Sequence, residues 1–382
     1  MLRALPASCG TSPFRQRQSH SSTEPNVPLT VTVIRDGTTV GTFTSAEIIS
    51  ADYAAYSPDI GFSGIATSSI DLTLVNKSSA TPACQKGDKI RISGAGLFPD
   101  FYVSDRTFDT YTTSFTAYDS CCKLDKEFDN SAFVDTVKVS GKTVIKYYTQ
   151  TEIISAMSTQ LGITITPPTD IDIKFQKADL SGTCRSILEA IAAINGCMFV
   201  CTTSNTIQAV LYQQYIATAN VSSYGEVLSD SSQVTFDGLV VRDTTFNKEY
   251  HYGTNSIFRY IDSALVKDNS SVGGALYTRF RGASYSSFTM RNAQVLSFTA
   301  NIPQQITYDV GGDDVTAVVL NISATYTAGG WLIEFSSPEC QPSDNTYQSK
   351  DQRLIDLALK QGLHGPLFVN ENGSGIAVEV GV

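Results

Sequence analysis

The sequence lacks long apolar runs. A membrane-spanning helix needs roughly 18 apolar residues in succession, and the best run, residues 187–200, is interrupted by Glu189 and Asn195. We therefore expect no insertion of the chain into a membrane. Residues 1–28 also lack the apolar core of a secretory signal, and their net charge is +2. We expect them to form a disordered N-terminal arm, because chain termini are commonly loose.

Basic residues are also scarce. The 382 residues include 27 Lys and Arg against 37 Asp and Glu, which gives a net charge of -10. Without the N-terminal arm, residues 29–382 carry -12. A surface that grips the phosphate backbone needs clustered Lys and Arg. This composition excludes nucleic acid as a tightly bound ligand.

The residues and motifs of familiar catalytic sites are largely missing. The chain has three histidines and one tryptophan, and it contains no nucleophile elbow, P-loop, H-E-x-x-H motif or dinucleotide fingerprint. His251 lies between two tyrosines on a predicted strand, with no nucleophile motif nearby. We predict that the protein is not an enzyme and that it binds no cofactor.

Metal sites are not indicated either. The eight cysteines include no C-x2-C pair, and no histidine lies near a cysteine pair in the sequence. Cys197 and Cys201 share one face of a predicted strand, so we expect them to be small core residues with free thiols. Asp313 and Asp314 follow two glycines, as in a tight hairpin turn, and lack the alternating oxygen ligands of a calcium loop.

The commonest pattern in the sequence is a short predicted strand followed by turn residues. Residues 30–33 alternate apolar and polar side chains, and Asp36-Gly37 is a turn signal before the next strand. Residues 70–74 alternate in the same way, and a Thr-rich strand follows at 112–118. This pattern predicts a small β-barrel over residues 29–125.

The sequence pattern changes over residues 126–212, where helical signals occur. Apolar residues recur at helical spacing over 151–161, and Gly162 ends the run. A second helix begins after Thr183, which can cap it, and ends at Asn195-Gly196. Two strand-like runs follow this helix. The segment is therefore predicted to be a mixed α/β domain.

Strand patterns return over residues 213–345, which we predict to be a second β-barrel. Residues 346–382 are predicted to be a C-terminal helix, over 349–361, and a tail. The predicted fold class is mainly β with an α+β insertion: two small β-barrels separated by mixed α/β segments.

Residues 60–128 resemble the first domain of phage tail-tip and baseplate hub proteins, which occur in long-tailed phages and related contractile particles. The likeness rests on four short strings: I-G-F-S-G-I-A-T-S-S-I-D-L-T-L at 60–74, K-G-D-K-I-R-I-S-G at 86–94, F-Y-V-S-D at 101–105 and T-A-Y-D-S-C-C-K-L-D at 116–125. Gly87-Asp88 leads a strand, the strand at 101–103 follows, and Tyr118-Asp119 ends the predicted barrel. The helix and hairpin at 183–211 fit the second domain of that family. Gly87, Asp88, Tyr118 and Asp119 are thus expected to be structural motif residues.

The resemblance implies a virion structural protein at the tail tip or baseplate, made in the bacterial host cytoplasm. It implies a homotrimer whose six similar barrels form a symmetry adaptor between a sixfold tail tube and a threefold tip. The implied partners are a tail tube or distal tail protein, a tape-measure protein, and a spike or fibre protein. DNA would pass through the ring during ejection without specific binding, and an acidic lining would suit that passage.

Two other functions are consistent with the same sequence. The chain is rich in Tyr and Phe, with 18 and 19 of them, and exposed aromatic rings can stack on sugars. A receptor-binding or carbohydrate-binding virion component would need a cleft lined by several tyrosines. A glycan hydrolase would need two carboxylates facing each other across a groove.

Overall fold

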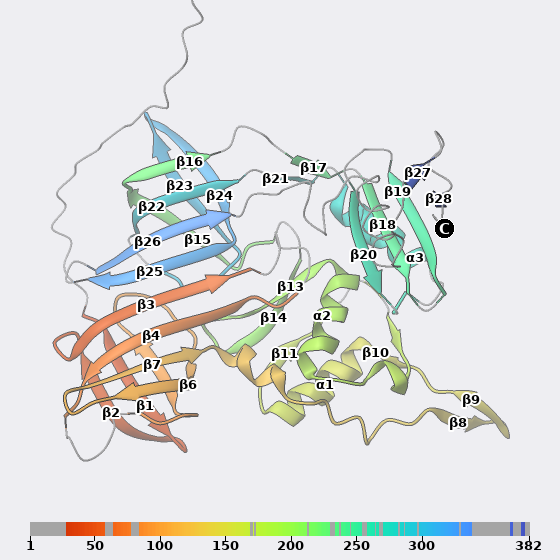
Figure 1. The fold of residues 1–382 in the computed structure, drawn as a ribbon, viewed down its shortest axis with the longest axis horizontal. Coiled ribbons are helices and arrows are strands. Elements are labelled where there is room, and N and C mark those ends of the chain that lie inside the picture. Colours follow the sequence, from red (N-terminus) through yellow and green to blue (C-terminus); the bar gives the residue numbers. More distant parts are fainter. Residues whose placement is uncertain are drawn as a thin grey trace, which may run out of the picture.

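The computed structural model shows a mainly β protein with three α-helices among the described residues (Figure 1). It describes residues 28–57, 64–77, 84–168, 171, 173–211, 214–229, 234–236, 238–244, 246–253, 258–263, 265–266, 270–281, 283–285, 287–295, 298–327, 330–337, 367–369 and 376–378. The predicted helix at 349–361 and residues 1–27 of the predicted N-terminal arm lie outside the described residues. No helix in the described part of the chain is long and apolar enough to cross a membrane.

The largest element is a 14-stranded sheet. Its strands alternate buried and accessible residues, as the period of two in the sequence predicted. In spatial order, they are β2 (Thr38–Thr44), β1 (Thr30–Arg35), β5 (Lys89–Ser93), β6 (Phe101–Phe108), β7 (Thr112–Tyr118), β4 (Thr67–Val75), β3 (Ile48–Tyr56), β25 (Asn321–Thr327), β26 (Gly330–Ser337), β22 (Phe288–Val295), β15 (Ala217–Ser223), β23 (Gln304–Val310) and β24 (Asp313–Val319), with β16 (Glu226–Ser229) also paired to β22.

Both strand-rich parts of the chain contribute to this one sheet. Strand β3, from the first part, pairs antiparallel with β25, from the second, so that Ala55 lies opposite Ile322. The prediction of two small β-barrels is therefore not confirmed, whereas the mainly β class is. A barrel strand and an open-sheet strand show the same alternation, and only the pairing partners distinguish them.

The predicted α/β insertion is present. Helix α1 (Gln150–Leu161) ends at Gly162, and α2 (Cys184–Asn195) begins after the cap Thr183 and ends at Gly196. Both glycines adopt the left-handed conformation, with φ of 61° and 56°. These helix predictions are confirmed. The other elements of this unit are η1 (Ser120–Asp125), β10 (Tyr148–Thr149), β11 (Thr164–Thr166), β12 (Lys174–Phe175), η2 (Lys177–Asp179), β13 (Cys197–Cys201) and β14 (Thr206–Leu211).

A smaller sheet and a third helix lie beside α2. The sheet consists of β18 (Gly238–Asp243), β19 (Lys248–Gly253) and β20 (Phe258–Ser263), and α3 (Ser270–Phe280) packs against it. Helix α3 is not predicted from the sequence, because Gly273 and Gly274 weaken the helical signal. Gly273 has a packing reason: a Cβ there would come within 2.5 Å of the Tyr252 ring.

Three further pairs of short antiparallel strands complete the described structure. They are β8 (Thr136–Val139) with β9 (Lys142–Ile145), β17 (Val234–Phe236) with β21 (Ala283–Tyr285), and β27 (Leu367–Val369) with β28 (Ile376–Val378). The β8–β9 hairpin extends away from the body of the molecule (Figure 1). Its strands are almost entirely exposed.

The buried apolar residues form two cores. One lies against the 14-stranded sheet, and the other joins α1, α2 and η1 to β18 and α3. Strand β13 separates them. Cys197, Phe199 and Cys201 face the α/β core, whereas Met198 and Val200 face the sheet core. A strand buried on both faces has a continuous apolar sequence, as C-M-F-V-C does.

Candidate functional site: the joint between the two cores

The two cores meet where β13 lies against the chain that enters β4. The Ala66 N–H donates to the Phe199 carbonyl at 2.8 Å, and the Phe199 N–H donates to the Gly64 carbonyl at 3.0 Å. Phe199 itself is fully buried. We call this contact, together with η1 and Arg185, the joint. It fixes the position of the α/β unit on the large sheet.

Asp119 is the main polar residue of the joint. It follows β7, is 2% exposed and caps η1 by accepting from the Cys121 N–H at 2.8 Å. Its other oxygen accepts from the Ser68 N–H at 2.8 Å and from the Ser68 hydroxyl at 2.6 Å. Burial raises the pKa of Asp119, although these hydrogen bonds act in the opposite direction. One carboxyl group therefore links β4, β7 and η1.

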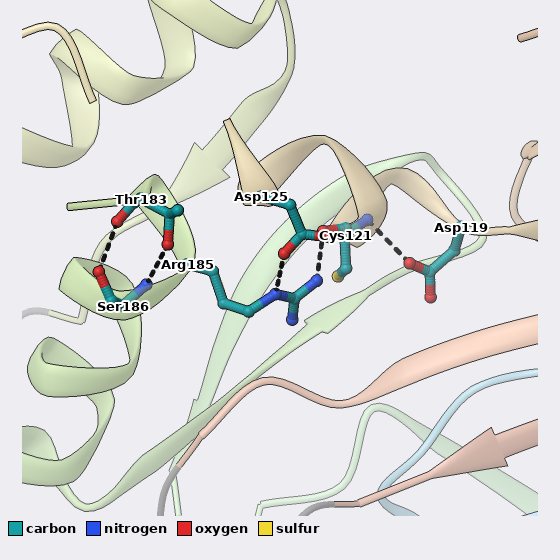
Figure 2. Close-up of polar contacts among 6 residues, drawn as sticks. All are labelled: Asp119, Cys121, Asp125, Thr183, Arg185 and Ser186. Atoms are coloured by element: carbon teal, nitrogen blue, oxygen red, sulfur yellow. Dashed lines mark hydrogen bonds and ion pairs between the residues drawn. The ribbon is translucent and has the colours of Figure 1, made fainter. Parts of the chain in front are cut away.

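Arg185 links the same 3-10 helix to α2 (Figure 2). Its Nε donates to the Asp125 carboxylate at 2.5 Å, and its Nη2 donates to the Cys121 carbonyl at 2.9 Å. Thr183, next to it, caps α2 by accepting from the Ser186 N–H at 3.2 Å. The guanidinium thus holds the start of α2 against the end of the large sheet.

Gly87 and Asp88 lie in the turn that leads into β5. Gly87 has a φ of +88°, which glycine adopts readily. Asp88 is 4% exposed and accepts two hydrogen bonds from Arg35, at 2.8 Å and 2.7 Å, and one from the Gln85 N–H at 2.6 Å. The pair therefore fixes the turn to β1.

The four motif residues lie at one end of the large sheet. Lys89 and Tyr118 both lie opposite Tyr102 of the intervening strand, so Gly87-Asp88 and Tyr118-Asp119 are separated by one strand. Tyr118 is 39% exposed, and Asp119 beside it is buried. The structure thus brings the two pairs to the same end of the large sheet, and none of the hydrogen bonds described joins their carboxylates.

Sequence reasoning missed a third carboxylate contact at this end. Asp100 accepts two hydrogen bonds from Arg91, at 2.9 Å and 3.1 Å, and its N–H donates to Asn205 of the β13–β14 turn at 2.5 Å. Burial opposes ionisation, but the hydrogen bonds from Arg91 and Lys89 lower the pKa of Asp100. Asn205 and Asp100 are 105 residues apart, so no local sequence signal could have linked them.

The joint offers little for nucleophilic or metal chemistry. Burial raises the pKa of the Cys197 and Cys201 thiols to about 12, which disfavours the thiolate. Within the described residues, no group of three or more His, Cys, Asp or Glu could hold a metal ion. The cysteines described are free, and all but Cys122 are buried, as predicted, whereas Cys9 and Cys340 lie outside the described residues.

Two residues considered as candidate chemical sites are ordinary parts of β structure. His251 lies on exposed β19, with its ring 3.3 Å from Glu249. Gly311 and Gly312 form the turn between β23 and β24, both with positive φ, and Asp313 begins β24 opposite Val310. The prediction of a hairpin at this position is confirmed.

The fold has counterparts among solved structures. No protein-family model and no curated protein matches the sequence. A 43 kDa tail protein of prophage MuSo2 from Shewanella oneidensis matches with a TM-score of 0.50 and 12% identity, over 81% of this chain and 97% of that one. A tail protein from Neisseria meningitidis MC58 matches with a TM-score of 0.50 and 11% identity, over 84% and 98%.

A third structure, prophage tail protein gp18 from Listeria monocytogenes EGD-e, has a TM-score of 0.49 and 9% identity, over 82% of this chain and 95% of that one. The chain has the fold of phage tail proteins. The match covers more than four fifths of the chain. The resemblance to phage tail proteins inferred from residues 60–128 is therefore confirmed at the level of the fold.

Proposed function

We propose that the protein is a structural hub at the distal end of a phage tail. It would join a sixfold tail tube to a threefold tip or spike as a homotrimeric ring with a channel for DNA. The observation that carries this proposal is the fold shared with two phage tail proteins over more than four fifths of the chain. The function is mechanical, and no catalytic step is assigned to it.

The joint suits such a role. A ring that carries load between a tube and a tip needs parts that keep their relative positions. Asp119 ties η1 to β4, and the ion-paired hydrogen bond between Arg185 and Asp125 ties η1 to α2. A hydrogen bond between charged groups is stronger than a neutral one. We propose that Gly87, Asp88, Tyr118 and Asp119 are structural motif residues of this framework.

The net negative charge of the chain is compatible with a channel through which DNA passes. Residues 29–382 carry -12. An acidic wall repels the phosphate backbone and releases no counterions on contact, so DNA would slide past it without being held. We propose the tail tip or baseplate of the virion as the location. The proposed partners are a tail tube or distal tail protein, a tape-measure protein and a spike or fibre protein.

The domain division expected from the sequence enters the same proposal. Residues 29–125 and 213–345 would supply the ring-forming β parts, and residues 126–212 the mixed part between them. Residues 346–382 would be a C-terminal helix and tail. Three copies would then present six similar β faces to a sixfold tube.

The receptor-binding alternative has less support. A pocket of about 190 Å³ on the outer face of the large sheet is lined by Asp71, Asp105, Arg106 and neighbouring threonines, and its one aromatic residue is Phe115. A sugar-binding cleft would be expected to contain several aromatic rings.

The mass of the purified protein in solution, followed by electron microscopy of the particles, tests the proposal. A trimer with a central opening is the expected result. A stable monomer that binds oligosaccharide would contradict it. Antibody labelling of intact virions provides a second measurement, in which the label should lie only at the distal end of the tail.

A further inference from the structure

The β8–β9 hairpin, which extends from the body of the molecule, carries exposed apolar side chains (Figure 1). Val137, Val139 and Val144 share one face, because Val137 lies opposite Val144 and Val139 opposite Lys142. Val139 is 54% exposed and Val144 41%. Among the described strands, β8 and β9 pair only with each other, so each has an open edge. Such a hairpin is poorly stable alone, and its apolar face and open edges suit a partner.

The hairpin is also basic in an acidic protein. Residues 136–146 contain Lys138, Lys142 and Lys146 and no acidic residue, which gives +3 out of a chain total of -10 and leaves -13 on the other residues. Among the described residues, neither Lys138 nor Lys142 has an ion-pair partner. The charge of the hairpin is therefore opposite in sign to that of its own chain.

A matching acidic edge lies elsewhere in the same chain. Strand β24 is the last strand of the large sheet and pairs only with β23 among the described strands. Residues 304–319 contain Asp309, Asp313 and Asp314 and no basic residue, which gives -3. Val310 and Val318 are exposed beside these carboxylates, at 44% and 37%. This edge thus combines open backbone groups, acidic groups and apolar side chains.

The two surfaces lie at opposite ends of the molecule (Figure 1). The hairpin therefore does not reach β24 of its own chain. A contact between two different patches on identical chains is heterologous, and it closes into a ring when the rotation between copies permits. The charge of the hairpin matches the edge of a second copy.

We propose that the β8–β9 hairpin of one copy adds to the open β24 edge of the next copy. Strand addition satisfies the free backbone groups of both edges, and exposed apolar side chains of the hairpin and of β24 gain cross-strand apolar neighbours. The hairpin lysines lie against the β24 carboxylates, which fixes direction and register. This contact rests on the proposed ring function and supplies its subunit interface.

Charge-swapped variants test the contact by sedimentation velocity over a range of protein and salt concentrations. K138E/K142E reverses the hairpin, D313K/D314K reverses the edge, and the fourfold variant reverses both. Each double variant should weaken self-association by at least about tenfold, because like charges then face each other. The fourfold variant should recover most of the association. K86E/K126E is the matched control, since both lysines are exposed, lie outside the hairpin and give the same change in net charge.

The outcomes separate the interface from the proposed function. Loss of association in both double variants with recovery in the fourfold variant supports the contact. A wild-type ring that persists unchanged in K138E/K142E overturns the contact and leaves the hub proposal standing. A wild-type protein that is monomeric at its highest soluble concentration and at low salt overturns both. Unchanged circular dichroism and thermal unfolding of K138E/K142E exclude misfolding as the cause.

Discussion

The joint and the β8–β9 hairpin lie close together in the sequence, but their contributions to the fold differ. η1 ends at Asp125, and β8 begins only eleven residues later, at Thr136. Asp119 and Cys121 in the joint are buried and bonded on several sides, whereas every residue of β9 is exposed. The joint therefore holds the two cores together, and the hairpin is free to contact something outside the chain. Stability and interaction are assigned to different segments, so they can be changed separately.

Truncation of a buried side chain of the joint should lower the free energy of unfolding far more than truncation of a hairpin side chain does. Phe199→Ala removes a ring that is fully buried beside α2. It should lower the free energy of unfolding by about 3–5 kcal/mol, from lost burial and the cavity left behind. Urea denaturation measures the effect. Val144→Ala in the hairpin is the control and should change that free energy by less than about 0.5 kcal/mol. An equal loss of unfolding free energy in the two variants would contradict the proposed difference between the joint and the hairpin.

Removal of the Asp119 carboxylate should have the next largest effect. Asp119→Ala leaves the Ser68 N–H, the Ser68 hydroxyl and the Cys121 N–H without their acceptor. Buried donors without partners should cost about 2–3 kcal/mol in the free energy of unfolding. Urea denaturation again provides the measurement. Asp135→Ala, just before the hairpin at an exposed position, is the matched control, and a similar loss there would contradict the interpretation.

The Asp119 carboxyl group should also make the free energy of unfolding depend on pH. Its pKa in the folded chain is raised above the ordinary value of 3.8, so the folded state binds the proton more tightly than the unfolded state does. The stabilisation is complete below the unfolded pKa and is lost as the pH rises through the folded pKa. The free energy of unfolding of wild type, relative to Asp119→Asn, should therefore decrease over that range. If the difference in unfolding free energy between wild type and Asp119→Asn stays constant with pH, Asp119 does not cause a pH dependence.

Two glycines provide the finest comparison. Gly87, in the turn before β5 of the large sheet, and Gly141, at the tip of the hairpin, have φ of +88° and +78°, and a Cβ at either would meet no atom within 4 Å. Alanine is strained at both positions, because both φ values are positive. Gly87→Ala should lower the free energy of unfolding by about 1 kcal/mol. Gly141→Ala should leave global unfolding unchanged, because the hairpin can open locally without the core. Hydrogen exchange of the hairpin amides would detect that local opening.

Local signals in the sequence predicted most of the regular elements. The caps and glycine stops of α1 and α2 are encoded within a few residues, and so are the turns at Asp36-Gly37 and Gly311-Gly312. Helix α3 was missed because Gly273 and Gly274 weaken the helical signal. Gly273 leaves space for the Tyr252 ring, from a strand about 20 residues away. Such a residue is explained only by its neighbour in space.

The candidate site was predicted only in part. The role of Gly87-Asp88 and Tyr118-Asp119 as motif residues stays a prediction. Arg185 and Asn205 were not identified from the sequence, because their partners lie 60 or more residues away in the chain. Alternation of side chains identified the strands but not their neighbours, so two barrels were expected where β3 and β25 join one sheet.

The sequence by itself determined the β-rich class, the two capped helices, the free buried thiols and the acidic balance, because each depends on composition or on residues close in the chain. Only the tertiary structure decided which strands pair, that β13 lies between two cores, and that a basic hairpin and an acidic sheet edge lie at opposite ends of the molecule. Those features depend on contacts between distant segments, and strand periodicity is the same whichever partner a strand has.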